Sequence, residues 1–279
     1  MNADSPWNSL ARMNASERWR QPSAAMGRAM TDVIVADAQV EAGMRVLDVA
    51  SGSGEPAISI AALLRGTGRV VATDISPGPL KIGEQRARER DLNNIEFVAA
   101  DVQQLPFPDD SFDRVTCRLG VMFFPDLPRA LGEMHRVLKP GGRVSLLAWG
   151  AINQPYFDST LGTILRLLPE LKLPESGLRM FKFAEAGALS AALRHAGFPI
   201  SGETVRDVPW NWPGTPEDLW AWFRAVTVPF QPLLQAVPEE RQSVVDAQVI
   251  AALRRRYNGH EVCFSASIVL ASAGIAVSG

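Results

Sequence analysis

A short loop near residue 50 has the residue types of a ligand-binding turn. Residues 46–54 read VLDVASGSG, so an apolar run that contains Asp48 leads into Gly52 and Gly54. Glycine lets the backbone approach a ligand closely, and the free N–H groups at the start of a following helix attract negative charge. A pair of glycines is weak evidence alone, so the acidic residues around the loop decide what it binds.

Two more carboxylates follow apolar runs further along the chain. Asp74 ends the run 70–74 and lies 20 residues after Gly54, a spacing at which a carboxylate reaches ribose hydroxyls. Asp101 follows the run 95–100 and can accept a hydrogen bond from an adenine amino group. The simpler alternative is that these residues and Asp48 only cap the next helices, where Asp is common. We favour an adenosyl site, because all three would meet at one sheet edge.

The same acidic residues separate two classes of ligand. A carboxylate at Asp74 suits a free ribose 2′-hydroxyl and would repel a 2′-phosphate, which disfavours NADP. Glu55, directly after the loop, would lie near the pyrophosphate of a dinucleotide. A ligand with a sulfonium and an ammonium group tolerates both Glu55 and Asp48. We therefore favour S-adenosyl-L-methionine over a nicotinamide dinucleotide, and keep a nucleotide-dependent oxidoreductase as the alternative.

Alternating strand and helix patterns must position these residues. Apolar, β-branched runs predict strands at 46–50, 70–74, 95–100, 114–118 and 143–149, with helices at 57–64, 79–91 and 129–138 between them. Later patterns predict helices at 184–196, 217–226 and 239–257, and strands near 201–208 and 261–271. Strand–helix alternation is typical of a parallel sheet covered on both faces, so the expected fold class is α/β, Rossmann-like and doubly wound.

Composition excludes several other classes. The 279 residues are 47% hydrophobic, and 28 Lys and Arg against 30 Asp and Glu give a formal charge of −2, without the basic excess of a nucleic-acid binder. Cys117 and Cys263 have no neighbours at metal-ligand spacing, so no metal site is expected. The first 22 residues contain no apolar run, and we expect a cytoplasmic protein without stable membrane insertion. The sequence does not indicate the oligomeric state.

Several sequence blocks resemble one known family. Besides 46–54, these are VATDIS at 71–76, AD at 100–101, FPDDSFD at 107–113 and RVLKPGG at 136–142. With these blocks in this order, residues 43–150 resemble the class I S-adenosylmethionine-dependent methyltransferases, in particular the group that contains the ubiquinone/menaquinone C-methyltransferases. The resemblance does not extend to the second half of the chain.

The resemblance implies a fold and a set of cofactor contacts. The fold is a mainly parallel seven-stranded sheet with an antiparallel last strand, whose terminal pair would be 201–208 and 261–271. S-adenosyl-L-methionine would be held at its methionine end by Ala50, Ser51, Gly52 and Gly54, at its ribose by Asp74 and Ile75, and at its adenine by Asp101 and Val102. Backbone groups of Arg118 and Leu119 would contact the amino acid portion. Together with Asp48, these are the predicted site residues.

The rest of the chain is expected to cover that site. We expect an N-terminal helical cap at 1–42 and a methyltransferase domain at 43–279, with helical lid elaborations at 151–182 and 209–258. Six aromatic residues gather in the second elaboration: Trp210, Trp212, Trp220, Trp222, Phe223 and Phe230. They could form a lid over an apolar substrate or the core of a small helical insert, and both interpretations stay open.

The predicted chemistry is methyl transfer to a small, uncharged acceptor that is aromatic or lipophilic. In-line displacement at a sulfonium needs collinear positioning in a dry site, and a base only where the acceptor must lose a proton. No catalytic residue is predicted; among the histidines, His260 is the most interesting because it precedes the last strand, near the lid. A non-catalytic S-adenosylmethionine-binding protein is a further alternative.

Overall fold

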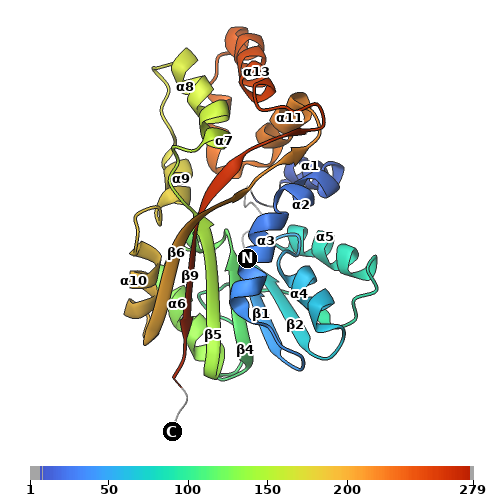
Figure 1. The fold of residues 1–279 in the computed structure, drawn as a ribbon, viewed down its shortest axis with the longest axis vertical. Coiled ribbons are helices and arrows are strands. Elements are labelled where there is room, and N and C mark those ends of the chain that lie inside the picture. Colours follow the sequence, from blue (N-terminus) through green and yellow to red (C-terminus); the bar gives the residue numbers. More distant parts are fainter. Residues whose placement is uncertain (1–6, 8, 277–279) are drawn as a thin grey trace.

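A twisted sheet of seven strands carries the site in this computed structural model, which describes residue 7 and residues 9–276 (Figure 1). Its strands are β1 (Arg45–Val49), β2 (Arg69–Asp74), β3 (Ile95–Ala99), β4 (Phe112–Arg118), β5 (Leu138–Trp149), β6 (Ile200–Pro209) and β9 (Ser265–Gly274). Their order is β3-β2-β1-β4-β5-β9-β6, and β9 runs antiparallel to both of its neighbours while the other pairs are parallel. The expected doubly wound, mainly parallel sheet with an antiparallel last strand is confirmed.

Helices cover both faces of this sheet. On one side, α3 (Arg28–Ala38), α4 (Ala57–Leu64) and α5 (Pro77–Arg88) contact β2 to β5, and on the other side α6 (Leu127–Val137) and α10 (Ala188–His195) contact β5, β6 and β9 (Figure 1). Helix α6 shows why the sequence folds this way locally. Asp126 caps its first turn by accepting a hydrogen bond from the Arg129 N–H at 3.0 Å, and the buried residues Leu131 and Met134 recur at helical spacing on its inner face.

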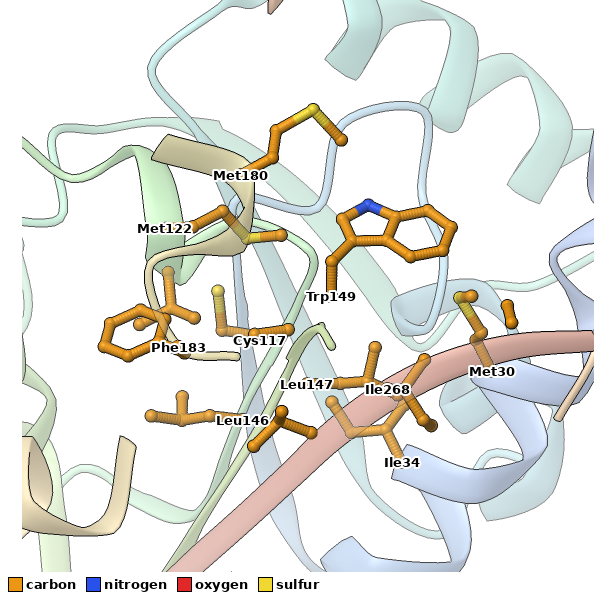
Figure 2. Packing of buried hydrophobic residues seen from close by; sticks show 14 of the residues in the cluster. Met30, Ile34, Cys117, Met122, Leu146, Leu147, Trp149, Met180, Phe183 and Ile268 are labelled. Atoms are coloured by element: carbon orange, nitrogen blue, oxygen red, sulfur yellow. The ribbon is translucent and has the colours of Figure 1, made fainter. Parts of the chain in front are cut away.

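The core lies between these layers. Successive residues of a strand point to opposite faces, so Leu146 and Leu147 of β5 pack on different sides of the sheet. Figure 2 shows Leu147 beside Ile268 of β9 and Ile34 of α3. All of these side chains are fully buried, which makes the sheet a rigid platform for the loops at its edge.

Two elaborations interrupt the second half of the fold. Between β5 and α10 lie α7 (Pro155–Phe157), the π-helical η3 (Asp158–Gly162), α8 (Thr163–Leu167), α9 (Glu175–Leu178) and η4 (Arg179–Phe181). Between β6 and β9 lie β7 (Trp212–Pro213), α11 (Pro216–Val226), η5 (Val228–Phe230), α12 (Gln231–Gln235), α13 (Glu239–Arg254) and β8 (Glu261–Val262). Figure 1 shows α7, α8, α11 and α13 gathered beyond one end of the sheet.

The N-terminal helices reach the same end. Helix α1 (Leu10–Arg18) contacts α11, and α2 (Arg20–Met26) contacts β7, so the N-terminal segment and the second elaboration meet over the sheet edge. The short turn η2 (Val121–Phe123) follows β4 at that edge. No helix among the described residues is long and apolar enough to cross a membrane.

Two element boundaries differ from the sequence prediction for identifiable reasons. Helix α10 begins at Ala188 rather than near 184, because Gly187 before it has a positive φ of 85°. The Glu203 carboxylate then caps the first turn, since it accepts hydrogen bonds from the N–H groups of Gly187 and Ser190 at 2.6 and 2.8 Å. The strand expected at 261–271 is two strands, because residues 261–262 form β8 and pair with β7, while β9 starts at Ser265.

Candidate functional site

Most of the predicted site residues lie on one wall. A cavity of about 390 Å³ opens where β1, β2 and β3 end. Its lining contains nine of the eleven predicted residues: Ala50, Ser51, Gly52, Asp74, Ile75, Asp101, Val102, Arg118 and Leu119. The structure thus brings together residues from four separate strand ends. We call this space the cofactor cavity.

Asp48 does not line this cavity, which corrects its predicted place. Its carboxylate is fully buried beneath the loop, where it accepts hydrogen bonds from the Thr116 hydroxyl at 2.7 Å and from the Ala57 N–H at 3.3 Å. Burial raises the pKa of Asp48 to about 7, although the Thr116 hydrogen bond opposes this rise. Asp48 therefore ties β4 and the start of α4 to the loop and positions it from below.

Gly54 is also absent from the lining. Its φ is +105°, and a Cβ there would lie 2.6 Å from Cδ1 of Ile58. Glycine is needed at this position so that the turn can pack against α4 and α5. By contrast, a Cβ at Gly52, with φ +54°, would meet no atom within 4 Å, so Gly52 faces open space in the cavity wall.

Asp74 fixes the loop as well as lining the cavity. One of its carboxylate oxygens accepts a hydrogen bond from the Gly52 N–H at 2.9 Å, and the other from the Ser76 N–H at 2.8 Å. Burial raises the pKa of Asp74, and these two hydrogen bonds oppose the rise. A carboxylate oxygen has more than one lone-pair site, so both oxygens remain able to accept ribose hydroxyls.

The far end of the cofactor cavity combines an apolar and a polar wall. Ile75 is 49% exposed, unusual for a large aliphatic side chain, and it lines the cavity with Val102. Asp101 lies beside them, and its carboxylate accepts a hydrogen bond from the Gln103 N–H at 2.8 Å. Apolar side chains next to a hydrogen-bond acceptor suit a flat ring with an amino group, as adenine has.

These residues fit S-adenosyl-L-methionine. The buried Ser51 hydroxyl has no hydrogen-bond partner among the described residues, and a buried polar group without a partner is costly unless a ligand supplies one. The cavity carries three carboxylates, from Glu55, Asp74 and Asp101, against the guanidinium groups of Arg12 and Arg118. That balance suits a ligand with two cationic groups and one carboxylate.

A second cavity, of about 310 Å³, adjoins the first. Its aromatic walls come from both elaborations and from the end of β5: Trp149, Tyr156, Phe157, Trp210, Trp222 and Phe223. The rings pack edge to face, with centroids 5.2 Å apart for Trp149 and Trp210. We call this space the aromatic chamber.

The aromatic cluster of the second elaboration serves as both core and wall. Trp212, Trp220 and Phe230 are at most 2% exposed and do not line the chamber, and the Trp220 indole donates a hydrogen bond to Asp246 at 2.7 Å. Trp210, Trp222 and Phe223 line it. Both interpretations of this cluster therefore apply, each to a different part of it.

The two cavities share a wall that the sequence did not reveal. Trp7, Arg12, Ser53, Glu55, Arg118, Leu119 and Phe123 line both of them. Arg12 comes from α1, and its guanidinium donates a hydrogen bond to the Trp7 carbonyl at 3.1 Å. The N-terminal segment shows no motif, so only the tertiary contacts of α1 with α11 and α5 identify Arg12. Trp7, beside Arg12, lines both cavities as well, whereas Trp19 and Met26 lie in the core.

The histidines do not contribute to either cavity. His135 packs against Phe198 with ring centroids 4.9 Å apart, and His195 contacts the Ala191 carbonyl at 2.7 Å. His260 is exposed in the loop before β8. Within the described residues no group of three His, Cys, Asp or Glu side chains could hold a metal ion.

Comparisons with known proteins agree with this arrangement. A family model described as the ubiE/COQ5 methyltransferase family matches residues 23–172. A demethylmenaquinone methyltransferase from Listeria welshimeri is 33% identical over 159 residues, 57% of this chain and 63% of that protein. The ubiquinone/menaquinone biosynthesis C-methyltransferase UbiE of Pseudomonas putida is 47% identical over 109 residues, 39% of this chain and 43% of that protein. The chain thus spans less than two thirds of the length of these curated relatives.

A solved structure extends the likeness in fold. Phosphoethanolamine N-methyltransferase 2 of Haemonchus contortus, in complex with S-adenosyl-L-methionine, has a TM-score of 0.58 and 15% identity, and the match covers 99% of this chain and 59% of that one. This likeness concerns the fold alone. The match of the family model over more than half of the sequence shows that this chain belongs to the ubiE/COQ5 methyltransferase family.

Proposed function

We propose that this protein transfers a methyl group from S-adenosyl-L-methionine to a small aromatic acceptor. The observation that carries this proposal is the shared wall of the two cavities. A cofactor held by the predicted residues of the first cavity would lie next to a chamber lined by aromatic rings. Direct transfer between two bound molecules requires such adjoining spaces.

The chain's contribution to this reaction is positioning. Bound in the cofactor cavity, S-adenosyl-L-methionine would supply a methyl group whose bond to sulfur breaks, with the electron pair remaining on sulfur, as an electron pair of the acceptor forms the new bond. Asp74 and Asp101, which line that cavity, would hold the ribose and the adenine, and the loop at Ser51 and Gly52 would hold the methionine end. Helices α1 and α11 are in contact, and would restrict the access of water to the reacting groups.

A hydroxyl in the chamber is suited to donating a hydrogen bond. Tyr156 is 3% exposed, and burial raises the pKa of its phenol. It therefore stays protonated at neutral pH and can donate to an oxygen of the acceptor, but it cannot act as a base there. A proton lost from the acceptor would pass to solvent.

The relatives support an aromatic acceptor without fixing its identity. Their names describe methyl transfer in menaquinone and ubiquinone biosynthesis, and quinone rings are flat and apolar. However, the family match ends at residue 172, and Trp210, Trp222 and Phe223 of the chamber lie beyond it. We therefore infer a quinol-like or other small aromatic acceptor whose selection depends on this chain's own second elaboration.

The oxidoreductase alternative fits the cavity less well. Glu55 lines it beside Ser53, where the pyrophosphate of a dinucleotide would lie, and its carboxylate is held in place by the Ser59 hydroxyl at 2.6 Å. A fixed carboxylate at this position repels a pyrophosphate and favours a sulfonium.

A methyl-transfer assay tests the proposal. The protein is incubated with S-adenosyl-L-methionine and a panel of quinols, phenols and aliphatic alcohols, and mass spectrometry follows both S-adenosylhomocysteine and methylated products. The expected result is stoichiometric formation of both with at least one aromatic acceptor. Cofactor binding without methylation of any acceptor would instead support the non-catalytic alternative, and methylation of aliphatic acceptors alone would contradict the aromatic one.

A further inference from the structure

Charge is distributed unevenly between the two cavities. Among the described residues, the lining of the aromatic chamber contains the guanidinium groups of Arg12, Arg20, Arg86 and Arg118, but only one carboxylate, that of Glu55. The other carboxylates of the site line the cofactor cavity alone. The chamber expected to take an uncharged acceptor therefore has a positively charged end.

Two of these arginines already have ionic partners. Arg20 forms an ion pair with Glu89 at 2.6 Å, and Arg86 pairs with Glu55 at 3.5 Å and donates to the Ser53 carbonyl at 2.7 Å. Glu55 also accepts a hydrogen bond from the Ser59 hydroxyl. The chamber's only carboxylate is thus engaged by Arg86.

Arg12 and Arg118 have no such partner. Neither forms an ion pair within the described part of the chain, and the hydrogen bonds of Arg118 go to the carbonyls of Glu55 and Gly27 at 3.4 and 3.5 Å. The buried Nε of Arg12 has no hydrogen-bond partner at all in that part. Asp74 acts on Arg12, and Glu55 and Asp48 act on Arg118, only at longer range than an ion pair. Both guanidinium groups therefore remain available to pair directly with a bound anion.

The cofactor supplies a single negative group. S-adenosyl-L-methionine has one carboxylate, while its sulfonium and ammonium groups would be matched by the carboxylates of the cofactor cavity. The cofactor's carboxylate can engage one of Arg12 and Arg118, which leaves the other for a group that enters from the chamber. Six aromatic rings line the rest of the chamber beside aliphatic and hydroxyl side chains, so we take that group to belong to an aromatic molecule.

We propose that the acceptor binds as an aromatic oxyanion, its negative oxygen held by Arg12 and Arg118 at the wall that both cavities share. This inference rests on the proposed methyl transfer and replaces the uncharged acceptor expected from the sequence. A carboxylate on the ring and an ionised ring hydroxyl are the two sources of such an oxyanion. An ionised ring hydroxyl would also raise the electron density of the acceptor, which reduces the need for a base.

Matched ligands test the charge preference in the wild-type protein saturated with S-adenosylhomocysteine. Calorimetry compares 2-naphthoate with 2-naphthalenemethanol, which has a similar ring and no charge. We expect 2-naphthoate to bind about tenfold more tightly or better, as one charge-assisted hydrogen bond provides. Equal affinities, or tighter binding of the alcohol, would overturn the inference. Failure of S-adenosylhomocysteine itself to bind would contradict the proposed function, a separately visible result.

Substitution of Arg12 tests whether this residue causes the preference for 2-naphthoate. Arg12→Gln is expected to lose the preference for 2-naphthoate, and Arg12→Lys, which keeps the charge, to retain part of it. Arg18→Gln is the control, because Arg18 is an exposed arginine on the same helix and lines neither cavity. An undiminished preference in folded Arg12→Gln would overturn the assignment to Arg12. An equal loss of the preference in Arg12→Gln and in Arg18→Gln would also overturn the assignment to Arg12.

Binding of 4-nitrophenol distinguishes an ionised ring hydroxyl from a carboxylate as the source of the oxyanion, because its absorbance reports whether its hydroxyl is ionised. If the ring hydroxyl is the anionic group, bound 4-nitrophenol absorbs as the phenolate at a pH below its solution pKa, and Arg12→Gln abolishes this shift. If only 2-naphthoate shows the preference, the oxyanion is a carboxylate. A neutral bound nitrophenol together with no preference for 2-naphthoate contradicts both sources.

Discussion

Gly54 and Gly83 pack backbone against backbone. A Cβ on Gly54 would lie 3.4 Å from Cα of Gly83, and a Cβ on Gly83 would lie 3.3 Å from the Gly54 nitrogen and 2.6 Å from the Phe97 ring. Helix α5 therefore rests directly on the loop after β1. This contact fixes the height of the loop above the sheet, and hence the floor of the cofactor cavity.

The two glycines of this loop should respond differently to alanine. Gly54→Ala is expected to destabilise the protein by about 1–3 kcal/mol or more, because its φ of +105° is strained for alanine and its Cβ would clash with Ile58. Gly52→Ala adds its methyl to open cavity space and should lower affinity for S-adenosylhomocysteine at a smaller cost in stability. Urea unfolding and calorimetry on both variants separate the effects. A larger loss of stability in Gly52→Ala, together with a larger loss of affinity in Gly54→Ala, would contradict these two roles.

Residues of the aromatic cluster should also differ in whether their substitution affects stability or ligand binding. Trp212→Ala empties a fully buried site and is expected to lower the free energy of unfolding by about 3–5 kcal/mol. Trp222→Ala removes a half-buried ring that lines the chamber, so it should cost less stability but weaken 2-naphthoate binding. Denaturant unfolding and calorimetry on the two variants check this. Unchanged ligand affinity in Trp222→Ala would remove this ring from the acceptor site.

The buried Asp48 predicts a dependence of stability on pH. Its pKa is about 7 in the folded protein and about 4 in the unfolded chain, so between these values the folded state binds more protons. This group therefore contributes stability that is complete below about pH 4 and declines by about 1.4 kcal/mol per pH unit as pH rises to about 7. Asp48→Asn should remove that decline. Parallel profiles for wild type and variant in urea unfolding at pH 4.5, 6 and 7.5 would refute this role.

Sequence patterns predicted the parts of the site that depend on local structure. The loop with Ser51 and Gly52, and the carboxylates Asp74 and Asp101, each follow a strand, and parallel strands bring their ends to one edge. Asp48 is the instructive error. It belongs to the same strand end, but its side chain points below the loop to Thr116, and the side to which a strand-end residue points depends on packing that the pattern does not show.

The acceptor side of the site was not predictable in this way. Arg12 lies in a polar N-terminal segment without a motif and reaches the site through the contacts of α1 with α11 and α5. Arg118 was expected to contribute backbone contacts, yet its guanidinium lines both cavities. Such long-range side-chain contacts leave no periodic signal in the sequence. The aromatic residues of the second elaboration were visible, but their division into core and wall required the three-dimensional packing.

Calorimetric titration with S-adenosylhomocysteine tests the central claim most directly. We expect saturable binding to the wild type and a loss of about 1–3 kcal/mol of binding free energy in Asp74→Ala, with Asp74→Asn intermediate because it keeps one hydrogen-bond acceptor for the loop. The exposed Asp32→Ala on α3 is the control and should bind as the wild type does. Folded wild-type protein that shows no binding at high micromolar S-adenosylhomocysteine, or that binds NADH in this cavity instead, would contradict the account.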